Sequence, residues 1–588
     1  MKSKTKAAIL ILLTIALATT MLTPLLAIVS SPIQQEAYTD WYTTSNTYGQ
    51  DVAAGDIDND GTEEIVTVNY YLTTDPWPAS PSYFTRYGQI RIFNHTGTAL
   101  QQECNYLWTN DTYYWREIFA VCIEDVNNDG RKEIITGGRI WELSPNAYEG
   151  EIAVWNWTGT TLIQLKYAKW SSPDNNLVYD VCAADVDNDG TVEIASTGTY
   201  HNDTTQISSE LRIWNYTGIT TPPATEYTKQ VWTSEMLYLT SVTTADVDND
   251  TQTEIITGGY RRSTTNYYIG QLKIWNWNGT TITLEKTEEW GTFTAGDSCV
   301  LYQVYAADLA DDNGLTEIIT VGYRNLTAYV AQVRIWNWNT THMTLRQNKE
   351  WTGPTSAYVC GVYAKEVDSD DTLEIITLGT EAVNASFSQA QLRTWEWNGT
   401  AMLYEQEAKW GNVTTGLDLA VDDVDDDQIN EILCIGNIQK TYWNAYLIIE
   451  SIPDLIPPDI GTPEQNPTSP VEEGTPVGVR VYICDYGVGL ENATLEYSTD
   501  NGSSWNPIAM SYNGTYDKWE ATIPGQPAET AVQYRIVAFD VAENMQVEDN
   551  AGSYYVYSVI PEYTMLLPLL FMTATLIAFA LTRTRKKP

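Results

Sequence analysis

The chain has 588 residues, which is longer than one ordinary domain, and its three His lie in polar, turn-like contexts while its seven Cys form no C-x-x-C pair. Its 76 acidic residues outnumber its 32 Lys and Arg residues, so the formal net charge is −44. This composition argues against nucleic acid or an anionic lipid surface as a partner, and against a His-dependent triad or a His-rich zinc site, although the acidity also fits solubility or adaptation to salt.

The N-terminal segment 1–31 has the pattern of a secretory signal. Lys2, Lys4 and Lys6 precede an uncharged apolar stretch over residues 7–29. A basic start followed by an apolar run is typical of export signals, and the candidate cleavage boundary lies at 27–31. Because the stretch is also long enough to span a bilayer, an uncleaved N-terminal anchor is the alternative.

From about residue 36 to 452 the chain repeats one acidic segment. In the copy at 185–193, Asp185, Asp187, Asp189 and Glu193 stand at positions 1, 3, 5 and 9, and Gly190 stands at position 6. Carboxylates at every second residue can converge on a hard divalent cation, and Gly permits the sharp turn between them. The copies start at residues 56, 125, 185, 246, 308, 366 and 423, which predicts a repeat architecture.

The candidate metal ligands follow from this spacing. They are Asp56, Asp58, Asp60, Glu64, Asp125, Asn127, Asp129, Glu133, Asp185, Asp187, Asp189, Glu193, Asp246, Asp248, Asp250, Glu254, Asp308, Asp311, Asn313, Glu317, Glu366, Asp368, Asp370, Glu374, Asp423, Asp425, Asp427 and Glu431. Thr251, Asp371 and Gln428 replace the Gly of copies four, six and seven, and Asp308 stands one residue out of register in copy five. The first three copies therefore predict the best sites.

Each repeat contains four predicted strands. In the third copy these strands cover residues 177–184, 193–198, 210–216 and 227–232. Four strands separated by turns rich in Gly, Asn and Asp predict one blade of a β-propeller. The third strand often carries aromatics at i and i+2, such as Trp155 and Trp157, which share one strand face. We expect these rings to fill the space between blades, and a sugar-stacking role is the alternative.

The two ends of the repeat are offset. A fourth-strand pattern ending in Trp precedes the first acidic segment at 38–41, whereas the last repeat ends on a third strand at 446–450. The N-terminal strand is therefore expected to complete the last blade. This would close a ring of seven blades and leave no open sheet edge.

The two faces of the expected ring differ. Each acidic segment connects the first strand of a blade to the second, so all seven lie on one face. The opposite face carries longer, aromatic-rich connections, and loops on a rigid scaffold often bind ligands. Candidate ligand-binding residues on that face are Tyr70, Trp77, Tyr83, Arg261, Tyr267, Tyr442 and Trp443. Ordinary loop divergence is the alternative.

Further segments follow the repeats. Residues 453–476 are Pro-rich and predict a linker, and residues 477–558 alternate as short strands that resemble a fibronectin type III or immunoglobulin-like β-sandwich. Residues 563–582 predict a transmembrane anchor, and residues 583–588 predict a basic cytoplasmic tail. With residues 561–563, this end resembles the archaeal PEF-type sorting signal.

Asn-x-Ser/Thr sequons support an exported glycoprotein. Six of them fall at the predicted turn between strands three and four, at Asn94, Asn156, Asn215, Asn278, Asn339 and Asn398. A bulky glycan requires an exposed turn, so this placement is physically sensible.

The seven copies over residues 36–452 resemble the FG-GAP (VCBS-like) repeats of integrin α-subunit propellers and their prokaryotic relatives. The resemblance implies a seven-bladed propeller that binds up to seven structural Ca²⁺ ions in the acidic segments. It also implies that the ligand face lies opposite the Ca²⁺ face. The carry-over is best in copies one, two and three.

Three functions fit these features. The first is a non-catalytic protein on the extracellular face of the membrane, held by the C-terminal anchor, for adhesion or for binding a protein or glycan. The second is a structural role in the cell envelope. The third is a polysaccharide-active, lyase-like enzyme on a Ca²⁺-rich propeller, since fold does not fix function.

Overall fold

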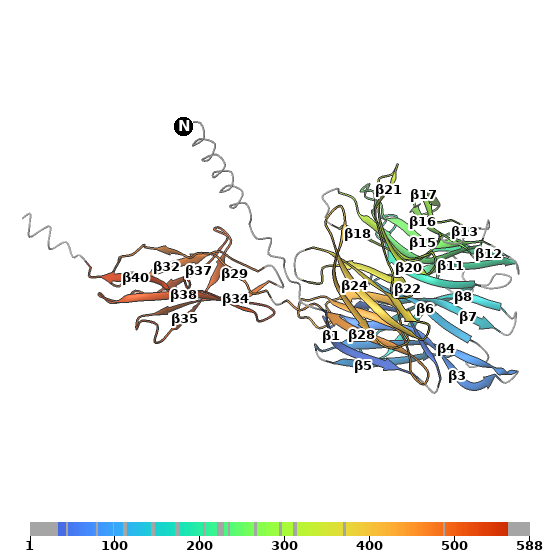
Figure 1. Cartoon of the computed structure of the whole chain (residues 1–588), viewed down its shortest axis with the longest axis horizontal. Helices are drawn as coiled ribbons and strands as arrows, with labels where there is room; N and C mark the ends of the chain where they lie inside the picture. The colour runs from blue at the N-terminus through green and yellow to red at the C-terminus, as the bar shows by residue number, and fades with distance from the viewer. Residues whose placement is uncertain are drawn as a thin grey trace, which may run out of the picture.

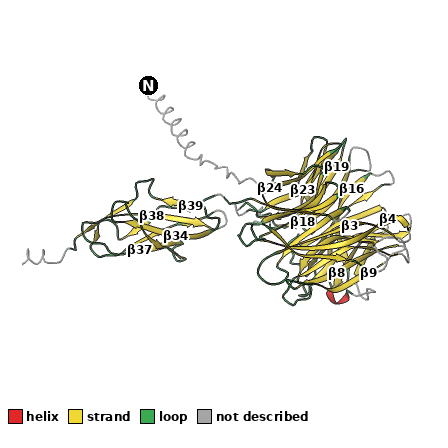
Figure 2. Cartoon of the chain, turned by 90° about the horizontal axis from the view of Figure 1, so that it is seen from below, coloured by secondary structure: helices red, strands yellow, loops and turns green. Residues whose placement is uncertain are grey.

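The fold is seen in a computed structural model of the chain. The structure describes residues 33–562 except the internal segments 43–44, 78–79, 98, 110–114, 143–146, 171–175, 204–205, 220–227, 233–235, 264–266, 293–296, 310–313, 369–371, 455 and 486–488. The described elements are strands and one short 3-10 helix, η1 (Tyr216–Gly218), drawn in red in Figure 2. The expected all-β class is confirmed, and Figure 1 shows two β-rich bodies joined by one stretch of chain.

The larger body contains seven four-stranded antiparallel sheets, which we number as blades 1 to 7. Blade 1 contains β2 (Thr47–Gly55), β3 (Glu64–Trp77), β4 (Ser80–His95) and β5 (Leu100–Trp108). Blade 2 contains β6 (Trp115–Glu124), β7 (Glu133–Glu142), β8 (Ala147–Trp157) and β9 (Leu162–Trp170). Blade 3 contains β10 (Asn176–Ala184), β11 (Glu193–Asp203), β12 (Gln206–Asn215) and β13 (Thr228–Trp232). Blade 4 contains β14 (Met236–Ala245), β15 (Glu254–Arg262), β16 (Tyr268–Trp277) and β17 (Ile282–Trp290). Blade 5 contains β18 (Ser298–Ala307), β19 (Glu317–Asn325), β20 (Tyr329–Trp338) and β21 (Met343–Trp351). Blade 6 contains β22 (Ser356–Lys365), β23 (Glu374–Asn384), β24 (Phe387–Trp397) and β25 (Met402–Trp410). Blade 7 is β26 (Thr414–Asp422), β27 (Glu431–Gln439), β28 (Trp443–Ser451) and β1 (Gln34–Trp41).

The blades close into a ring, which is the arrangement of a β-propeller. The first strands of neighbouring blades contact one another in chain order, and β26 contacts β2. The N-terminal strand β1 pairs antiparallel with β28, so the expected closure is confirmed (Figure 1). Blade 7 is thereby built from both ends of the propeller sequence, and main-chain hydrogen bonds between β1 and β28 hold the two ends together.

Aromatic rings fill the seams between neighbouring blades, as the i, i+2 pattern predicted. The Trp at the end of a fourth strand packs on the aromatic of the next blade's third strand. The ring centroids are 4.7 Å apart for Trp108–Trp155, 5.0 Å for Trp170–Trp214, 5.3 Å for Trp290–Trp336 and 5.0 Å for Trp351–Trp395. These are distances at which aromatic pairs attract beyond their burial of area.

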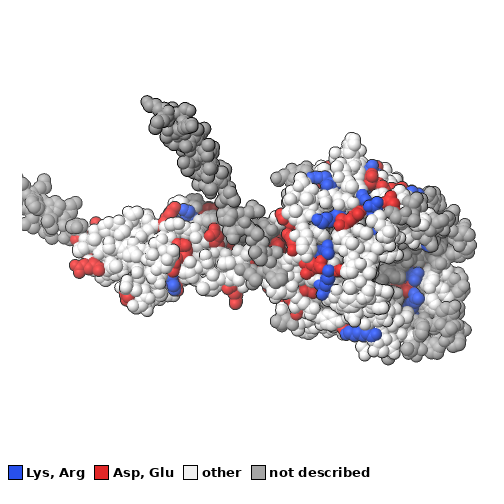
Figure 3. Space-filling model, viewed as in Figure 1, with Lys and Arg blue, Asp and Glu red and all other residues white. Residues whose placement is uncertain are grey.

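Basic side chains cover these seams rather than forming a free patch. The guanidinium of Arg393 lies 4.8 Å from the Trp351 ring centroid and its Nη2 lies 2.8 Å from Glu407. Arg212 repeats this stacking at 4.3 Å over Trp170. Figure 3 shows blue and red side chains next to one another on the visible side of the propeller. The Arg side chains that stack on seam Trp rings therefore also neutralise nearby carboxylates.

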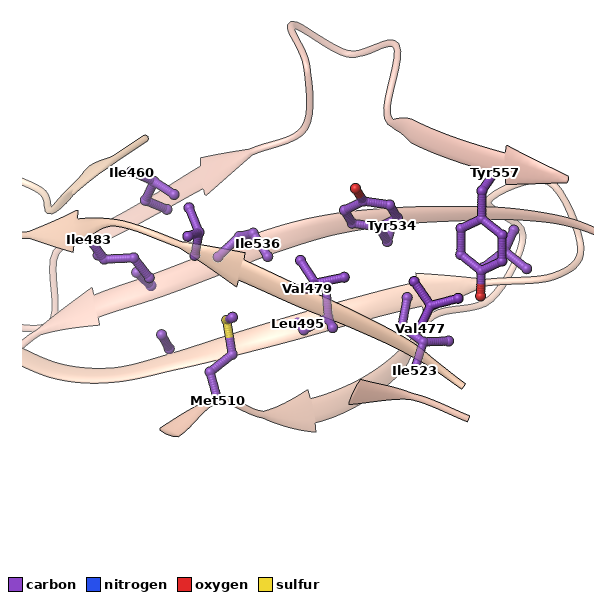
Figure 4. Packing of buried hydrophobic residues seen from close by; sticks show 14 of the residues in the cluster. Ile460, Val477, Val479, Ile483, Leu495, Met510, Ile523, Tyr534, Ile536 and Tyr557 are labelled. Carbon is purple, nitrogen blue, oxygen red and sulfur yellow. The ribbon is translucent and has the colours of Figure 1, made fainter. Parts of the chain in front are cut away.

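The smaller body is a β-sandwich. One sheet has the order β30 (Glu464–Asn466), β32 (Val477–Val481), β37 (Lys518–Ile523), β36 (Ser511–Asn513). The other contains β31 (Val471–Glu472), β40 (Tyr555–Ile560), β38 (Ala531–Asp540), β34 (Leu490–Ser498), β35 (Asn506–Ala509) and β39 (Met545–Glu548), and β29 (Asp459–Ile460) pairs with β33 (Ile483–Cys484). Val479, Leu495 and Ile536 lie between the sheets with no exposed surface (Figure 4).

The expected linker 453–476 differs from the structure. It contains β29, β30 and β31, which pair with sandwich strands. Ile460 and Val471 are buried in the sandwich core. These two apolar side chains explain why the segment joins the sandwich in spite of its Pro content, because burying them offsets the cost of ordering the chain.

The predicted membrane segments lie outside the described residues. These are the signal segment 1–31, the anchor 563–582 and the tail 583–588. Among the residues that the structure describes, no helix is long and apolar enough to cross a membrane.

Candidate metal loops and the opposite face

The acidic segments form loops with one repeated hydrogen-bond pattern. At position 1, Asp56 accepts the N–H of Asp60 on Oδ1 at 3.2 Å and the N–H of Gly61 on Oδ2 at 3.2 Å. The same pair of bonds recurs at Asp125, Asp185, Asp246 and Asp423. These five loops are therefore preshaped by their own first carboxylates.

The residue at position 6 needs a left-handed backbone. Gly61 has φ +97°, and an added Cβ would meet nothing within 4 Å, so the need is conformational rather than steric. Thr251 and Gln428 adopt φ 77° and 70° at the same place and donate the same N–H to Asp246 and Asp423. Loops four and seven thus keep the geometry of the Gly loops, at the cost of strain at a non-Gly residue.

The Glu at position 9 lies beneath its loop. Glu64 is 1% exposed, and its Oε2 accepts the N–H of Ile57 at 3.1 Å. The equivalent bond recurs in every loop, including Leu309 N to Glu317 Oε2 at 3.0 Å. Leu309 therefore takes the place of Ile57, and Asp308 directly follows β18 as Asp56 follows β2. Asp308 therefore stands at position 1 of its loop, not one residue out of register as expected. The extra residue of copy five falls between Leu309 and Gly314 in the sequence.

The side chain at position 3 lies against the neighbouring blade. A Cβ on Gly159, in the turn between β8 and β9, would lie 2.7 Å from Oδ2 of Asp58 in blade 1. Gly279 meets Asp187 at 2.8 Å and Gly97 meets Asp425 at 3.1 Å in the same way. The Gly of this turn therefore permits the close approach of the preceding blade's carboxylate.

The loop oxygens fit a hard divalent cation. Ligand oxygens of Asp56, Asp58 and Glu64 lie within 4.8 Å of one another, as do those of Asp185, Asp187 and Glu193. A third group contains Asp246, Asp248 and Asp250. These oxygen-rich groups have the ligand type that Ca²⁺ takes, with several carboxylates from one short loop.

Several of these oxygens are buried without a hydrogen-bond partner. They are Asp58 Oδ1, Asn127 Oδ1, Asp248 Oδ1, Asp425 Oδ1, Glu254 Oε1 and Glu431 Oε1. A buried polar atom without a partner is costly, and a cation would satisfy it. This observation supports the fit of a metal better than the acidic composition does.

Burial and mutual repulsion raise the pKa of the loop carboxyls. Burial, followed by neighbouring carboxylates, raises the pKa of Glu254 to about 8. For Glu64 burial again dominates and its pKa is about 8, and for Glu431 it is about 9. A bound cation would reverse this effect, because it favours the ionised carboxylate.

Parts of loops five and six lie outside the described residues. Asp311, Asn313 and Asp370 belong to these segments. Glu366, Asp368 and Glu374 are described, and Val367 N donates to Glu374 Oε2 at 2.9 Å.

The Asp at position 5 also shapes its loop. Asp129, Asp189 and Asp427 accept the N–H two residues further on, as Asp60 and Asp250 do. Glu133 and Glu193 are buried beneath their loops.

Neighbouring loops are also joined to one another, which no sequence pattern above indicated. The Asn at position 4 is left-handed and donates its amide to the carbonyl at position 6 of the next loop. The distances are 2.9 Å for Asn59 Nδ2 to Gly130 O, 2.9 Å for Asn128 Nδ2 to Gly190 O, 2.6 Å for Asn188 Nδ2 to Thr251 O and 3.0 Å for Asn249 Nδ2 to Gly314 O. The repeated Asn at this position was the available signal.

The central channel carries a second repeated feature. Each first strand has a β-bulge at the same place, and the residues after the bulges are Asp51, Ala120, Asp180, Ser241, Gln303, Gly361 and Asp418. Four of these residues accept a main-chain N–H of the next blade on their side chains: Asp51 Oδ2 accepts Val121 N at 2.7 Å, Asp180 Oδ2 accepts Val242 N at 2.8 Å, and Ser241 and Gln303 accept Val304 N and Val362 N. The five polar residues of this ring, Asp51, Asp180, Ser241, Gln303 and Asp418, line a cavity of about 240 Å³, and their hydrogen bonds tie first strands together.

The described members of the predicted ligand-face set lie in separate groups. Tyr70 and Trp443 come together around Tyr48, with centroid distances of 5.3 Å and 6.5 Å. Tyr442 lies 6.3 Å from Tyr42. Arg261 is in blade 4, where it forms an ion pair with Glu289 at 2.9 Å, and Tyr267 closes the β15–β16 turn through its backbone. Trp77 and Tyr83 belong to β3 and β4, and their side chains lie outside the described part.

Aromatic rings gather on this face, most of them in first strands; they are half-buried, except for Tyr323, which is buried. We call them the aromatic belt: Tyr48, Tyr70, Phe119, Tyr179, Tyr238, Tyr260, Tyr302, Tyr323, Tyr358 and Trp443. Neighbouring centroids are 6.1 Å apart for Tyr70–Phe119, 6.4 Å for Phe119–Tyr179, 5.0 Å for Tyr238–Tyr260, 5.8 Å for Tyr302–Tyr323 and 6.3 Å for Tyr302–Tyr358. Most of the belt was absent from the sequence-based candidates, although Phe119, Tyr179 and Tyr302 occupy the bulge in their repeats.

A charged cluster borders the belt where blade 1 meets blade 2, with Arg86 in β4 and Glu117 and Arg139 in β6 and β7. Glu117 is 2% exposed and forms ion pairs with both Arg86 and Arg139. The Arg86 guanidinium lies 5.9 Å from the Tyr70 centroid, and Arg139 lies 5.6 Å from Phe119. Aromatic faces and oriented cations thus lie side by side, which is the combination found in many binding sites.

The chain was compared with known proteins. No curated protein sequence matches it. Among solved structures, rhamnogalacturonan lyase YesW is similar at 11% identity, covering 68% of this chain and 90% of that chain with a TM-score of 0.28. An exo-inulinase from Aspergillus awamori has 10% identity, 88% and 91% coverage and a TM-score of 0.26, and a β-fructofuranosidase from Schwanniomyces occidentalis has 8% identity, 87% and 98% coverage and a TM-score of 0.29. The family model of the FG-GAP-like repeat matches residues 125–196, so the chain carries an FG-GAP-like repeat that spans acidic loops two and three.

Proposed function

We propose that this protein is a non-catalytic, Ca²⁺-dependent binding protein of the cell surface, used for adhesion or for recognition of an extracellular protein or glycan. The N-terminal segment would export it, and the C-terminal segment would hold it on the outer face of the membrane. The propeller would present the ligand site, and the sandwich would act as a spacer.

The observation that carries the proposal is the aromatic belt opposite the acidic loops. Its rings other than Tyr323 are half-buried, so each of these is fixed by neighbours while keeping exposed surface. Fixed aromatic rings lose little conformational entropy on binding and present apolar faces to a sugar or a side chain. Arg86, Glu117 and Arg139 would add the polar contacts that set orientation.

Ca²⁺ would act as a structural ion. The loops lie at the strand ends opposite the belt, and their hydrogen bonds already shape them. The cation would pair with the buried loop oxygens and remove the repulsion between carboxylates. Binding at the belt would then depend on Ca²⁺ through the rigidity of the ring, without contact between ion and ligand.

The metal part of the proposal is tested by thermal unfolding of the full-length protein. Chelation should lower Tm by many degrees, and added Ca²⁺ should restore it, because a ligand that binds only the folded state stabilises it. Asp58→Asn should weaken the Ca²⁺ response, whereas Glu491→Gln on the exposed sandwich surface should not. An unchanged Tm on chelation would contradict the metal role.

The ligand part is tested by glycan and surface-protein arrays at saturating Ca²⁺. Tyr70→Ala and Phe119→Ala should reduce binding of the retained ligand at least about tenfold, as truncation of aromatic anchors does. Tyr404→Ala is the matched control, because Tyr404 is 53% exposed on β25, an outer strand. Equal loss in all three variants, or none, would move the function away from this face.

A further inference from the structure

The seam between blade 7 and blade 1 contains a buried His at a position where four other blades have Trp. His95 is the last residue of β4, and its register partner in β5 is Leu100. Trp157, Trp277, Trp338 and Trp397 occupy the same register position in other blades. The expectation that every His lies in a polar turn is therefore wrong for His95, because this position faces the neighbouring blade.

Two carboxylates converge on this imidazole from different parts of the chain. His95 Nδ1 lies 3.6 Å from Asp425 Oδ2 and 4.0 Å from Glu36 Oε2. Asp425 is position 3 of the seventh acidic loop, and Glu36 belongs to the closing strand β1. The three ligand atoms lie within 4.8 Å of one another. Strand β1, blade 1 and blade 7 thus meet at one point.

The site is buried and its polar atoms are unsatisfied. The His95 side chain has no exposed surface, and neither ring nitrogen has a hydrogen-bond partner. Glu36 Oε2 and Asp425 Oδ1 are also buried without a partner. A fully buried imidazole with two unsatisfied nitrogens is costly unless another group occupies the space between it and the carboxylates.

The distances favour a shared cation over direct hydrogen bonds. Both separations exceed the range of an N–H···O hydrogen bond. Two ligands held at about 2.0–2.2 Å in a tetrahedral shell lie roughly 3.4 Å apart, which is close to the observed spacing. Imidazole nitrogen with carboxylate oxygen suits Zn²⁺ and similar first-row divalent ions, whereas Ca²⁺ takes oxygen ligands.

The comparison with an ordinary seam sharpens this choice. Glu36 sits at a bulge of its outer strand, between Gln35 and Ala37, and Glu285 sits at the equivalent bulge of β17. In blade 4 the Trp338 side chain of the next blade lies at Glu285, and its Nε1 is buried without a hydrogen-bond partner, while a carboxylate oxygen of Glu285 lies within 4.8 Å of those of Asp248 and Glu254. An indole can only donate a hydrogen bond, whereas an imidazole nitrogen can also ligate a metal.

We propose that His95, Glu36 and Asp425 form a Zn²⁺-type transition-metal site that locks the ring at the closing seam. Asp425 would be shared between this site and the seventh Ca²⁺ loop. The metal would join the N-terminal strand to both blades that it closes. This site is independent of the ligand face and of the proposed binding function.

The test uses the full-length protein saturated with Ca²⁺. Titration calorimetry should detect one Zn²⁺ per chain, and Co²⁺ should give the visible absorption of a nitrogen- and oxygen-ligated site. His95→Gln and Glu36→Gln should each weaken Zn²⁺ binding at least about tenfold. His342→Gln is the control, because His342 is exposed on the hairpin of another blade and should leave binding unchanged.

The outcomes separate the metal site from a purely structural His. His95→Trp introduces the residue of the ordinary seams and should abolish Zn²⁺ binding while the far-UV spectrum stays native. Absence of Zn²⁺ binding to the Ca²⁺-saturated wild type would overturn the proposal. Unchanged Zn²⁺ affinity in Glu36→Gln would do so as well, and this variant serves if His95→Gln does not fold.

Discussion

The closing seam of the propeller differs from the seams within the repeat. Within the repeat, Trp155 packs on Trp108 and donates its indole N–H to Thr136 at 3.0 Å. At the closing seam, Phe93 takes the place of Trp155 and lies 5.7 Å from Trp41. Phe93 has no N–H to donate, and the hydroxyl of Thr67, which is equivalent to that of Thr136, is buried without a partner.

The two kinds of seam are held together by different contacts. The same Trp–Trp contact recurs in the seams between blades 1 and 2, 2 and 3, 4 and 5, and 5 and 6, so each of these seams duplicates the others. Where the two ends of the propeller meet, Phe93 and His95 stand at two positions that Trp occupies in other blades. Glu36 and Asp425 lie beside His95, and β1 adds main-chain hydrogen bonds to β28. We therefore expect the internal seams to contribute mainly by burial, and the closing seam mainly by polar and main-chain contacts.

The largest expected effect comes from emptying an internal seam. Trp155 has no exposed surface, so Trp155→Ala removes a large apolar side chain and leaves a cavity against Trp108. The free energy of unfolding should fall by about 3–5 kcal/mol. Urea unfolding in saturating Ca²⁺, followed by Trp fluorescence and circular dichroism, measures it. A change below about 1 kcal/mol would mean that neighbouring blades collapse into the gap.

A reciprocal exchange compares the two seams directly. Trp155→Phe should cost about 1–3 kcal/mol, because it orphans the Thr136 hydroxyl and leaves a smaller cavity. Phe93→Trp should add about 1 kcal/mol, because its indole can donate to the unsatisfied Thr67 hydroxyl. The same urea unfolding measures both.

The sign of the second substitution is the sharper result. Phe93 is only 2% exposed, so a larger ring fits only if Trp41 moves slightly. Suppose that Phe93→Trp lowers stability while Trp155→Phe behaves as expected. The closing seam would then be packed specifically around Phe, rather than being an internal seam that has lost its Trp.

Most of the propeller could be predicted from the sequence because its signals are periodic. The Trp at the end of each fourth strand and the acidic loops recur at a fixed place in each unit, and the offset of 38–41 predicted β1. The position-4 Asn bonds and the bulge ring were not predicted, because both depend on contacts between blades. His95 could have been found by aligning it with Trp157, whereas the aromatic belt combines residues from different strands of several blades.

The next prediction concerns the channel, where blade 7 meets blade 1. Asp418 Oδ1 accepts Leu419 N at 2.7 Å and Gln303 Nε2 at 2.9 Å, and its carboxyl also bonds to Asp51. Burial raises the pKa of both carboxyls, and Asp51 is raised further by the charge of Asp418 and of Asp180. The internal seams have no such carboxyl pair among the described residues after the bulges.

This pair should make stability depend on pH with a defined sign. At this pair the folded chain retains protons that the unfolded chain has released above about pH 4, so the pair's contribution to stability is greatest in acid and is lost as pH rises through the raised pKa values. Asp418→Asn keeps the acceptor oxygen and can donate to Asp51, so the decline of Tm from pH 5 to 8 should become shallower. Glu491→Gln is the control, and equal slopes in all three proteins at saturating Ca²⁺ would exclude the pair as the cause.

The smallest expected effect concerns the bond between neighbouring loops. Asn128 donates to Gly190 O at 2.9 Å, whereas the closing seam has Asp426 at this position, with the same left-handed φ of 61° but no N–H to donate. Asp426 also faces Glu63, whose pKa is raised by burial and then by the charges of Asp422 and Asp426. Asn128→Asp should therefore lower stability by about 0.5 kcal/mol and Asp426→Asn should raise it by a similar amount, since both residues tolerate the left-handed backbone. Tm at saturating Ca²⁺ measures both, and shifts of the same sign would mean that charge near the loops, rather than the amide bond, distinguishes the closing seam from the others.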